Sequence, residues 1–206
     1  MKANVVTMLI AVLLASPHVM AQVNACGDLK NHYGPFDYRT APQSERDLIE
    51  NYHFTPKVAA LKEGQSTTYI GADIAYTLRV FPNHPRALYA MAELARREKR
   101  PTPEKAGLSV ECWFERAMRF RPDDGAVHII YGIELLKDGR REQAVQQLER
   151  GLELLPDSGN AHYNVGLAYF DLGDYVSARE HAKKAKELGY TLPGLQRKLE
   201  KMGKWE

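Results

Sequence analysis

Apolar and small residues recur at a regular spacing along the second half of the chain. Two segments align without a gap at an offset of 34 residues, one running from Gly125 to Pro156 and the other from Gly159 to Tyr190. Each contains two stretches with apolar residues at helical spacing, separated by a turn glycine that ends the first helix. The pattern predicts two helical hairpins, neither of which can bury its apolar stripe without a stacked neighbour.

Both segments resemble the tetratricopeptide repeat family over their whole length. That family places apolar or small residues at repeat positions 4, 7, 8, 11, 20, 24, 27 and 32. The first segment has His128, Tyr131, Gly132, Leu135, Ala144, Leu148, Gly151 and Pro156 there, and the second has His162, Val165, Gly166, Tyr169, Ala178, Ala182, Ala185 and Tyr190. The resemblance implies an all-α solenoid of stacked helical hairpins.

A third hairpin precedes these two, so we expect a solenoid of about three repeats. It covers residues 83–122, with six extra residues in the loop from Lys99 to Gly107, and the regular units cover 123–156 and 157–190. Residues 55–82 carry two further helix signals, beginning at Thr55 and Tyr69, and predict a degenerate hairpin. Residues 191–206 predict a C-terminal capping helix opened by Pro193, with an apolar face of Leu192, Leu195, Leu199 and Met202.

Residues 22–54 lead into this array and are expected to form an irregular N-terminal arm, because no helical period runs through residues 22–47. Repeat positions 22 and 23 are expected to face solvent, yet the first repeat has Cys112 and Trp113 there. We therefore hypothesise that the arm crosses this hairpin with Cys26 bonded to Cys112. Unpaired thiols and a loose arm remain the alternative.

Residues 1–21 have the features of a signal peptide. Lys2 gives a positive start, the apolar run from Val5 to Ala15 is too short to cross a bilayer, and cleavage is expected after Ala21. The mature chain has no stretch of membrane-spanning length, so we expect a periplasmic or secreted protein. A lipid anchor at Cys26 is the competing interpretation, because Val23–Cys26 loosely matches a lipobox.

The composition adds few constraints. Of 206 residues, 44% are hydrophobic and 26% charged, and the net charge is +2, which is typical of a soluble globular protein. So small an excess predicts no nucleic-acid partner. The local basic run Arg96, Arg97, Lys99, Arg100 and Lys105 is interpreted as a solvated helix end.

No motif for catalysis, metal binding or a cofactor is present, so we expect a protein that is not an enzyme. His128 and His162 share one repeat position, about one helix spacing apart, which is long for shared metal ligation. Both are interpreted as structural residues.

The first helices of such hairpins line a concave groove in the family that this chain resembles, and the groove is the expected peptide-binding site. Its candidate residues are Tyr89, Glu93, Ile129, Ile133, Leu136, Asn160, Tyr163, Asn164, Leu167 and Phe170. So many apolar positions imply a cover, which could be a partner peptide or helix, a second copy of the chain, or its own C-terminal helix. We expect an adaptor or assembly factor that holds another protein. A structural subunit or lipoprotein of an envelope or secretion machine is the alternative.

Overall fold

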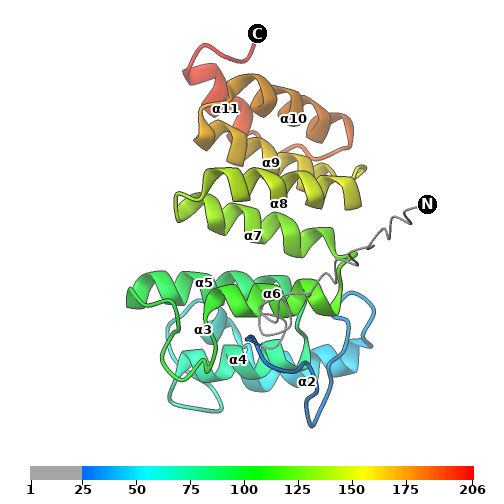
Figure 1. Ribbon diagram of the computed structural model, residues 1–206. Helices are drawn as coiled ribbons and strands as arrows, with labels where there is room; N and C mark the ends of the chain where they lie inside the picture. Colours follow the sequence, from blue (N-terminus) through cyan, green and yellow to red (C-terminus); the bar gives the residue numbers. More distant parts are fainter. Residues whose placement is uncertain (1–24) are drawn as a thin grey trace, which may run out of the picture.

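The computed structural model describes residues 25–206, and the predicted signal peptide lies outside the described residues. Within this range the chain consists of helices joined by turns and loops (Figure 1). The helices are α2 (Gln43–His53), α3 (Pro56–Ala59), α4 (Ile70–Val80), α5 (Pro85–Glu98), α6 (Val110–Phe120), α7 (Gly125–Lys137), α8 (Arg141–Leu154), α9 (Gly159–Leu172), α10 (Tyr175–Glu187) and α11 (Gly194–Lys201).

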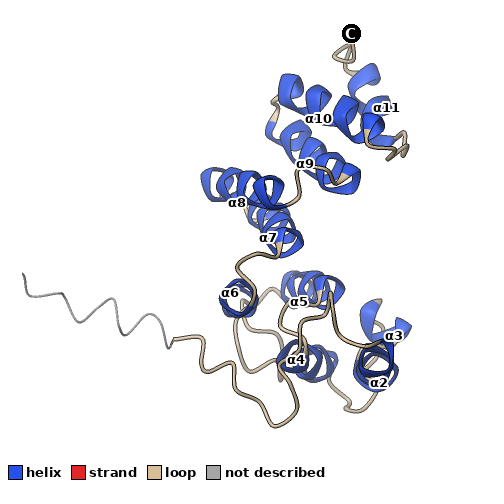
Figure 2. Ribbon diagram, turned by 90° about the vertical axis from the view of Figure 1, so that its right-hand side faces the viewer, coloured by secondary structure: helices blue, strands red, loops and turns tan. Residues whose placement is uncertain are grey.

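Three hairpins stack one on another: α5 with α6, α7 with α8, and α9 with α10. Figure 2 shows α5, α7 and α9 following one another along the stack, with α6 and α8 on its other side. The predicted all-α solenoid is confirmed, and each hairpin lies within its predicted unit. The six-residue insertion also falls where expected, between the end of α5 at Glu98 and the start of α6 at Val110.

Small residues set the distance between the two helices of a hairpin. A Cβ atom added to Gly132 would lie 2.7 Å from Cγ of Leu148 and 3.0 Å from the carbonyl oxygen of Ala144. The equivalent Gly166 would meet the carbonyl oxygen of Ala178 at 3.2 Å. Larger residues at these positions would force the helices apart, which is why the repeat pattern requires glycine and alanine there.

The N-terminal arm is more regular than its sequence suggested, because residues 43–53 form α2. The expectation of an irregular segment over 22–54 is wrong for this part. The helix is largely polar and buries only Ile49, so it has no apolar period to recognise. Tertiary packing supports it instead, since Ile49 lies in a buried cluster with Ala41, Val80 and Phe81.

Residues 25–30 of the arm are bound to α6, as the hypothesis required. Cys26 is joined to Cys112 by a disulfide, with the two Cα atoms 5.0 Å apart. Arg116 donates from Nη1 to the carbonyl oxygen of Cys26 at 3.2 Å, and Arg119 donates from Nη2 to that of Gly27 at 2.6 Å. Backbone carbonyls that would otherwise lack intramolecular partners are thereby satisfied by α6.

Asp37 fastens the next part of the arm to the turns that lead into α5 and α7. Its carboxylate accepts a hydrogen bond from Asn83 Nδ2 at 2.7 Å and pairs with Arg121 at 2.6 Å and with Arg39 at 2.9 Å. Asn83 also donates to Asp124, the cap residue of α7, at 2.7 Å. Burial alone would raise the pKa of Asp37, but these bonds outweigh it and hold the pKa well below its ordinary value.

Trp113 is 2% exposed, but the reason differs from the one that the sequence suggested. Repeat position 23 does not face solvent, because its side chain meets position 4 of the same hairpin. In the second hairpin these positions are Gln147 and His128, whose Oε1 and Nδ1 atoms lie 2.8 Å apart. Trp113 accordingly belongs to a buried cluster that also contains Ile74 of α4. Of these two residues, Cys112 at position 22 is the one that is bonded to the arm.

The degenerate hairpin predicted over 55–82 retains its second helix, α4, but its first is the single turn α3. A loop replaces the missing turns and is fixed by the fully buried Asp73. Asp73 accepts from the backbone N–H groups of Gln65 and Thr67 at 2.7 and 3.2 Å, and His53 Nδ1 lies 3.0 Å from its other oxygen.

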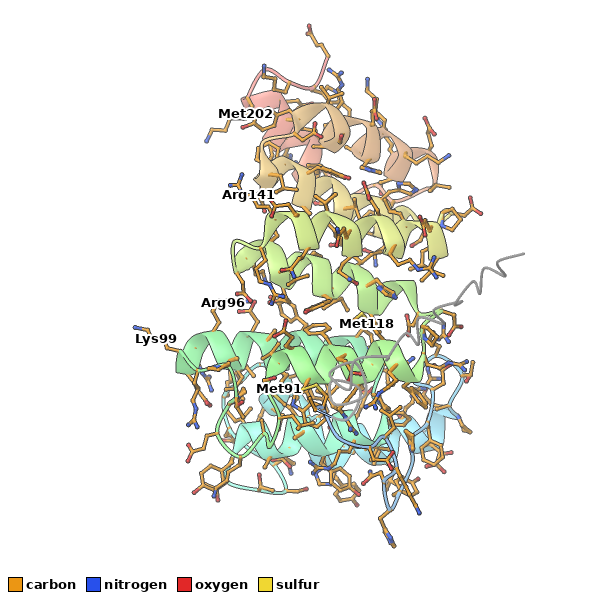
Figure 3. All side chains as sticks on the ribbon, in the orientation of Figure 1. Met91, Arg96, Lys99, Met118, Arg141 and Met202 are labelled. Atoms are coloured by element: carbon orange, nitrogen blue, oxygen red, sulfur yellow. A yellow bond between two sulfur atoms is a disulfide. The ribbon has the colours of Figure 1, made fainter. Side chains whose placement is uncertain are left out.

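The C-terminal helix α11 covers the last hairpin, as expected, through the fully buried Leu195 and Leu199. Leu192 and Met202 were expected on the same face but are 57% and 50% exposed. The reason is that the helix begins at Gly194 and ends at Lys201, so neither residue lies on it. Met202 marks the outer end of the stack in Figure 3.

His84 connects α2 to α5 from inside the core. Its Nδ1 atom accepts a hydrogen bond from the backbone N–H of Ala87 at 3.2 Å and so caps α5. The neutral ring therefore carries its proton on Nε2, and this atom lies 3.3 Å from Oε1 of Glu50. Burial lowers the pKa of His84. This contact with His84 is the largest cause that lowers the pKa of Glu50 to about 2.

Breaking the disulfide should destabilise the fold. We expect Cys112→Ser to lower the free energy of unfolding by about 2–4 kcal/mol, because the unfolded chain regains the entropy of an open loop. Urea unfolding with and without a reductant measures the effect. The double variant with Cys26→Ser is the control, since a reductant should leave its stability unchanged. Equal stability of oxidised wild type and Cys112→Ser would contradict the prediction.

The free energy of unfolding should also decrease as the pH is lowered. The unfolded chain protonates histidine near its ordinary pKa of 6.5, whereas folding holds the pKa of His84 lower, so the free energy of unfolding decreases as pH falls through that value. Glu50 adds a second loss between its ordinary value of 4.5 and about 2. We expect His84→Asn, which keeps a capping acceptor, to reduce the first loss in urea unfolding at neutral pH and at about pH 5. The loss that remains comes from His181, whose pKa is also lowered. An equal loss in both proteins would refute this origin.

Candidate binding groove

A groove runs across the first helices of the three hairpins. One hollow of about 600 Å³ is bordered by Tyr89 of α5, by Ile129 and Ile133 of α7, and by Asn164 of α9. A second, of about 410 Å³, is bordered by Ile133, Leu136, Asn164 and Leu167. Both hollows share Ile133, Lys137 and Asn164, so they form one continuous surface. Six of the ten predicted groove residues therefore lie together.

Helix α7 provides the apolar floor of this groove. Ile129 is 5% exposed and belongs to the buried cluster of the second hairpin, whereas Ile133 and Leu136 are half-buried and pack on that cluster. Tyr89, at the α5 wall, is 47% exposed. These aliphatic side chains pack on the core on one side and face solvent on the other, so they can bury further apolar area when another surface covers them.

Asn164 contributes a polar group at the centre of the groove. Its Nδ2 atom donates to the carbonyl oxygen and to Oδ1 of Asn160, at 2.9 and 2.7 Å. Both donors of the amide are thereby directed to its own helix, so its Oδ1 atom is the group left to accept from a ligand. Asn160 itself is exposed and borders neither hollow.

The rim between α5 and α7 carries charges that neutralise one another. Lys137 Nζ lies 2.7 Å from Glu93 Oε1 and 3.0 Å from Glu134 Oε1, and 4.7 Å from the centre of the Tyr89 ring. Arg96, seen beside α5 in Figure 3, pairs with both carboxylates. Burial alone would lower the pKa of Lys137, but its bonds to the two glutamates outweigh this and raise it. Glu93 therefore forms ion pairs at the rim of the groove and does not belong to its apolar floor.

Tyr163 and Phe170 were predicted to line the groove, and the C-terminal helix covers them instead. Both pack on the cluster that contains Leu195 and Leu199 of α11. A Cβ atom on Gly194 would lie 2.6 Å from the Tyr163 hydroxyl, and Lys198 Nζ sits 5.1 Å from the centre of the Phe170 ring. The last hairpin is therefore closed by the chain itself, and the open groove ends at Leu167.

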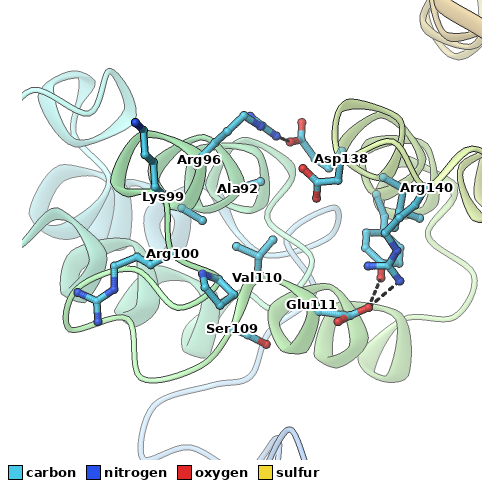
Figure 4. Close-up of a pocket in the computed structure, with 14 residues that line it drawn as sticks. Ala92, Arg96, Lys99, Arg100, Ser109, Val110, Glu111, Asp138 and Arg140 are labelled. Carbon is cyan, nitrogen blue, oxygen red and sulfur yellow. Dashed lines mark hydrogen bonds and ion pairs between the residues drawn. The ribbon is translucent and has the colours of Figure 1, made fainter.

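A separate cavity of about 390 Å³ lies between the first two hairpins, beside the insertion loop (Figure 4). Arg140 pairs with Glu111 at 2.8 Å, and Arg96 pairs with Glu134. The predicted basic run is partly structural as well, because Lys105 Nζ lies 5.5 Å from the centre of the Tyr69 ring. With Lys99, Arg100 and Asp138, the lining of the cavity has four cationic and three acidic side chains, so it lacks the concentrated positive charge that an anion site needs.

The stacked helical hairpins form a solenoid of the tetratricopeptide repeat type. Residues 132–190 match the family model described as tetratricopeptide repeat. This range starts in the middle of α7 and ends after α10, so it contains most of the second hairpin and all of the third.

Part of the chain is similar to peroxisomal targeting signal receptors of fungi. The receptor of Candida albicans is 33% identical over 78 residues, which are 38% of this chain and 13% of the receptor. The receptor of Eremothecium gossypii is 33% identical over 73 residues, which are 35% of this chain and 13% of the receptor. The receptor of Saccharomyces cerevisiae is 31% identical over 70 residues, which are 34% of this chain and 11% of the receptor. The chain therefore spans only about an eighth of the length of these relatives. The similarity supports protein–protein interaction as the general role.

The buried carboxylate of Glu134 should be the main contact at the junction of the first two hairpins. We expect Glu134→Gln to lower the free energy of unfolding by about 1.5–3 kcal/mol, because Arg96 and Lys137 lose a charged acceptor. The matched control is Glu153→Gln, which removes an exposed ion pair with Arg150 and should change stability by less than about 0.5 kcal/mol. Thermal or urea unfolding compares them, and equal effects would contradict the assignment.

Proposed function

We propose that this protein is an exported adaptor or assembly factor that holds a segment of another protein in its groove. The observation that carries the proposal is the open aliphatic floor of Ile133 and Leu136, continuous with Leu167 and lying between two walls. Both ends of the stack are closed, by α4 with the arm and by α11, whereas this middle section is not. The resemblance to repeats that bind other polypeptides points the same way.

The chemistry of the groove favours an apolar segment as its occupant. The rim charges are paired among themselves. The other charged residues that border the hollows are Arg86, Arg141 and Asp171, which sum to only +1, so the groove offers little net attraction to an acidic or basic peptide. Aliphatic side chains on the floor and one amide oxygen at Asn164 fit an extended peptide or helix that presents Leu, Ile or Val side chains. A second copy of this chain is the competing occupant.

Export is proposed from the leader sequence, and the disulfide is consistent with an oxidising compartment. A lipid anchor at Cys26 would need the same sulfur atom that bonds Cys112, which favours a protein released after cleavage. No helix among residues 25–206 combines the length and hydrophobicity required to span a bilayer.

Peptide selection on the purified mature protein tests the groove. We expect peptides chosen from a random library to be rich in aliphatic residues and to lose at least tenfold in affinity, about 1.4 kcal/mol, when Ile133→Glu places a charge on the floor. The control is Val176→Glu, at a residue that is 58% exposed on α10 and outside the groove.

Crosslinking from a photoreactive residue at position 167 locates the bound peptide. Peptides that bind both variants equally and do not crosslink from position 167 would refute the proposal. Crosslinks between two copies of the chain would identify the groove as a homo-oligomer interface instead.

A further inference from the structure

Two histidines face each other inside the third hairpin. His162 lies on α9 and His181 on α10, and their Nδ1 atoms are 3.0 Å apart. The two helices lie close together at Gly166, where an added Cβ atom would be 3.2 Å from the carbonyl oxygen of Ala178 and from Cβ of His181. His181 was not predicted to contact His162, because repeat positions 4 and 23 were not expected to meet.

The hydrogen bonds of His162 define its protonation. Its Nε2 atom lies 2.9 Å from the carbonyl oxygen of Pro156, and a carbonyl can only accept, so Nε2 carries the proton. The Nδ1 atom of the neutral ring is then a lone-pair donor directed at His181. A histidine that ligates a metal commonly donates its other ring N–H to a backbone carbonyl in this way.

His181 is held in place by Tyr169, whose ring stacks on it at 5.5 Å and 10°. Burial lowers the pKa of His181, and the nearby His162 lowers it further. The other charged groups that act on His181 are Glu180 and Asp174, and both favour a cation.

We propose that His162 and His181 form a binding site for a divalent first-row transition metal ion, with the two Nδ1 atoms as ligands. Imidazole nitrogens at about 2.0–2.1 Å from one ion, at angles between square-planar and tetrahedral, lie roughly 2.9–3.4 Å apart. Without metal, the His181 Nδ1 proton bridges the two rings. On binding, that proton moves to Nε2 of His181, and the two rings turn so that both Nδ1 lone pairs point at the ion.

Among residues 25–206, no group of three or more His, Cys, Asp or Glu side chains is arranged for a metal. Water therefore completes the coordination sphere, and the site binds less tightly than a structural zinc site. Imidazole ligands suit Cu²⁺, Ni²⁺ and Zn²⁺, and their order of affinity places Cu²⁺ first.

The second hairpin provides the comparison. Its equivalent pair, His128 and Gln147, makes a hydrogen bond of 2.8 Å between helices α7 and α8. A glutamine therefore satisfies the position-4 histidine without a second imidazole. His181→Gln copies this natural arrangement into the third hairpin, and it removes one metal ligand while retaining the polar contact.

Titration of the mature protein with Cu²⁺ against a competing chelator tests the proposal. We expect the wild type to bind one equivalent more than His181→Gln, or at least tenfold more tightly. Electron paramagnetic resonance of the bound Cu²⁺ should show two imidazole nitrogens in the wild type only. The control His32→Gln removes an exposed histidine of the arm and should leave this site unchanged.

Thermal unfolding without metal checks that both variants are folded. If His181→Gln is folded and binds Cu²⁺ as the wild type does, the pair is only a hydrogen bond and the proposal is wrong. If that variant does not fold, the wild-type spectrum decides alone, and a spectrum without two imidazole nitrogens overturns the site.

Discussion

The whole molecule depends on one constraint: a narrow helical hairpin cannot bury its own apolar face, so each hairpin must be covered by the next. Gly132 and Gly166 make the hairpins narrow by bringing their helices into contact. Stacking then buries the apolar faces inside the array but leaves an apolar face exposed at each of its two ends. At one end the chain supplies α4, with α2 and the arm, and at the other it supplies α11. The groove over α7 is apolar surface that neither closure reaches.

The N-terminal closure is mainly polar and covalent, in contrast to the apolar contacts of α11. Cys26 fixes the start of the arm to α6, and Asp37 fixes its middle to the turns before α5 and α7. The pKa of Asp37 is held low by these contacts, and the pKa of Glu50 is held low by His84 and Tyr38, so the arm is most firmly bound when its carboxylates are ionised. The redox state of the disulfide and the ionisation of these carboxylates therefore act on the N-terminal end of the stack.

The repeats were predictable because their residues are selected by local geometry that recurs at each unit: turn glycines, helix caps and small residues at the contact. The errors came where tertiary packing decides. Helix α2 has no apolar period, so only its contact with Phe81 and Val80 supports it. Trp113 was rightly expected to be covered but placed on the wrong face, since repeat position 23 points into the hairpin. Tyr163 and Phe170 have groove spacing, and the sequence could not show that α11 folds back over them.

Central to this account is that both ends of the stack are closed while the floor over α7 is open. Carbene footprinting of the mature protein in solution, read residue by residue, tests this most directly. We predict strong labelling of Ile133 and Leu136, and protection of Trp113, Leu195 and Leu199, at every protein concentration. Protection of Ile133 to the same degree as Leu195 would contradict the account, because the groove would then be covered by the chain itself or by a second copy.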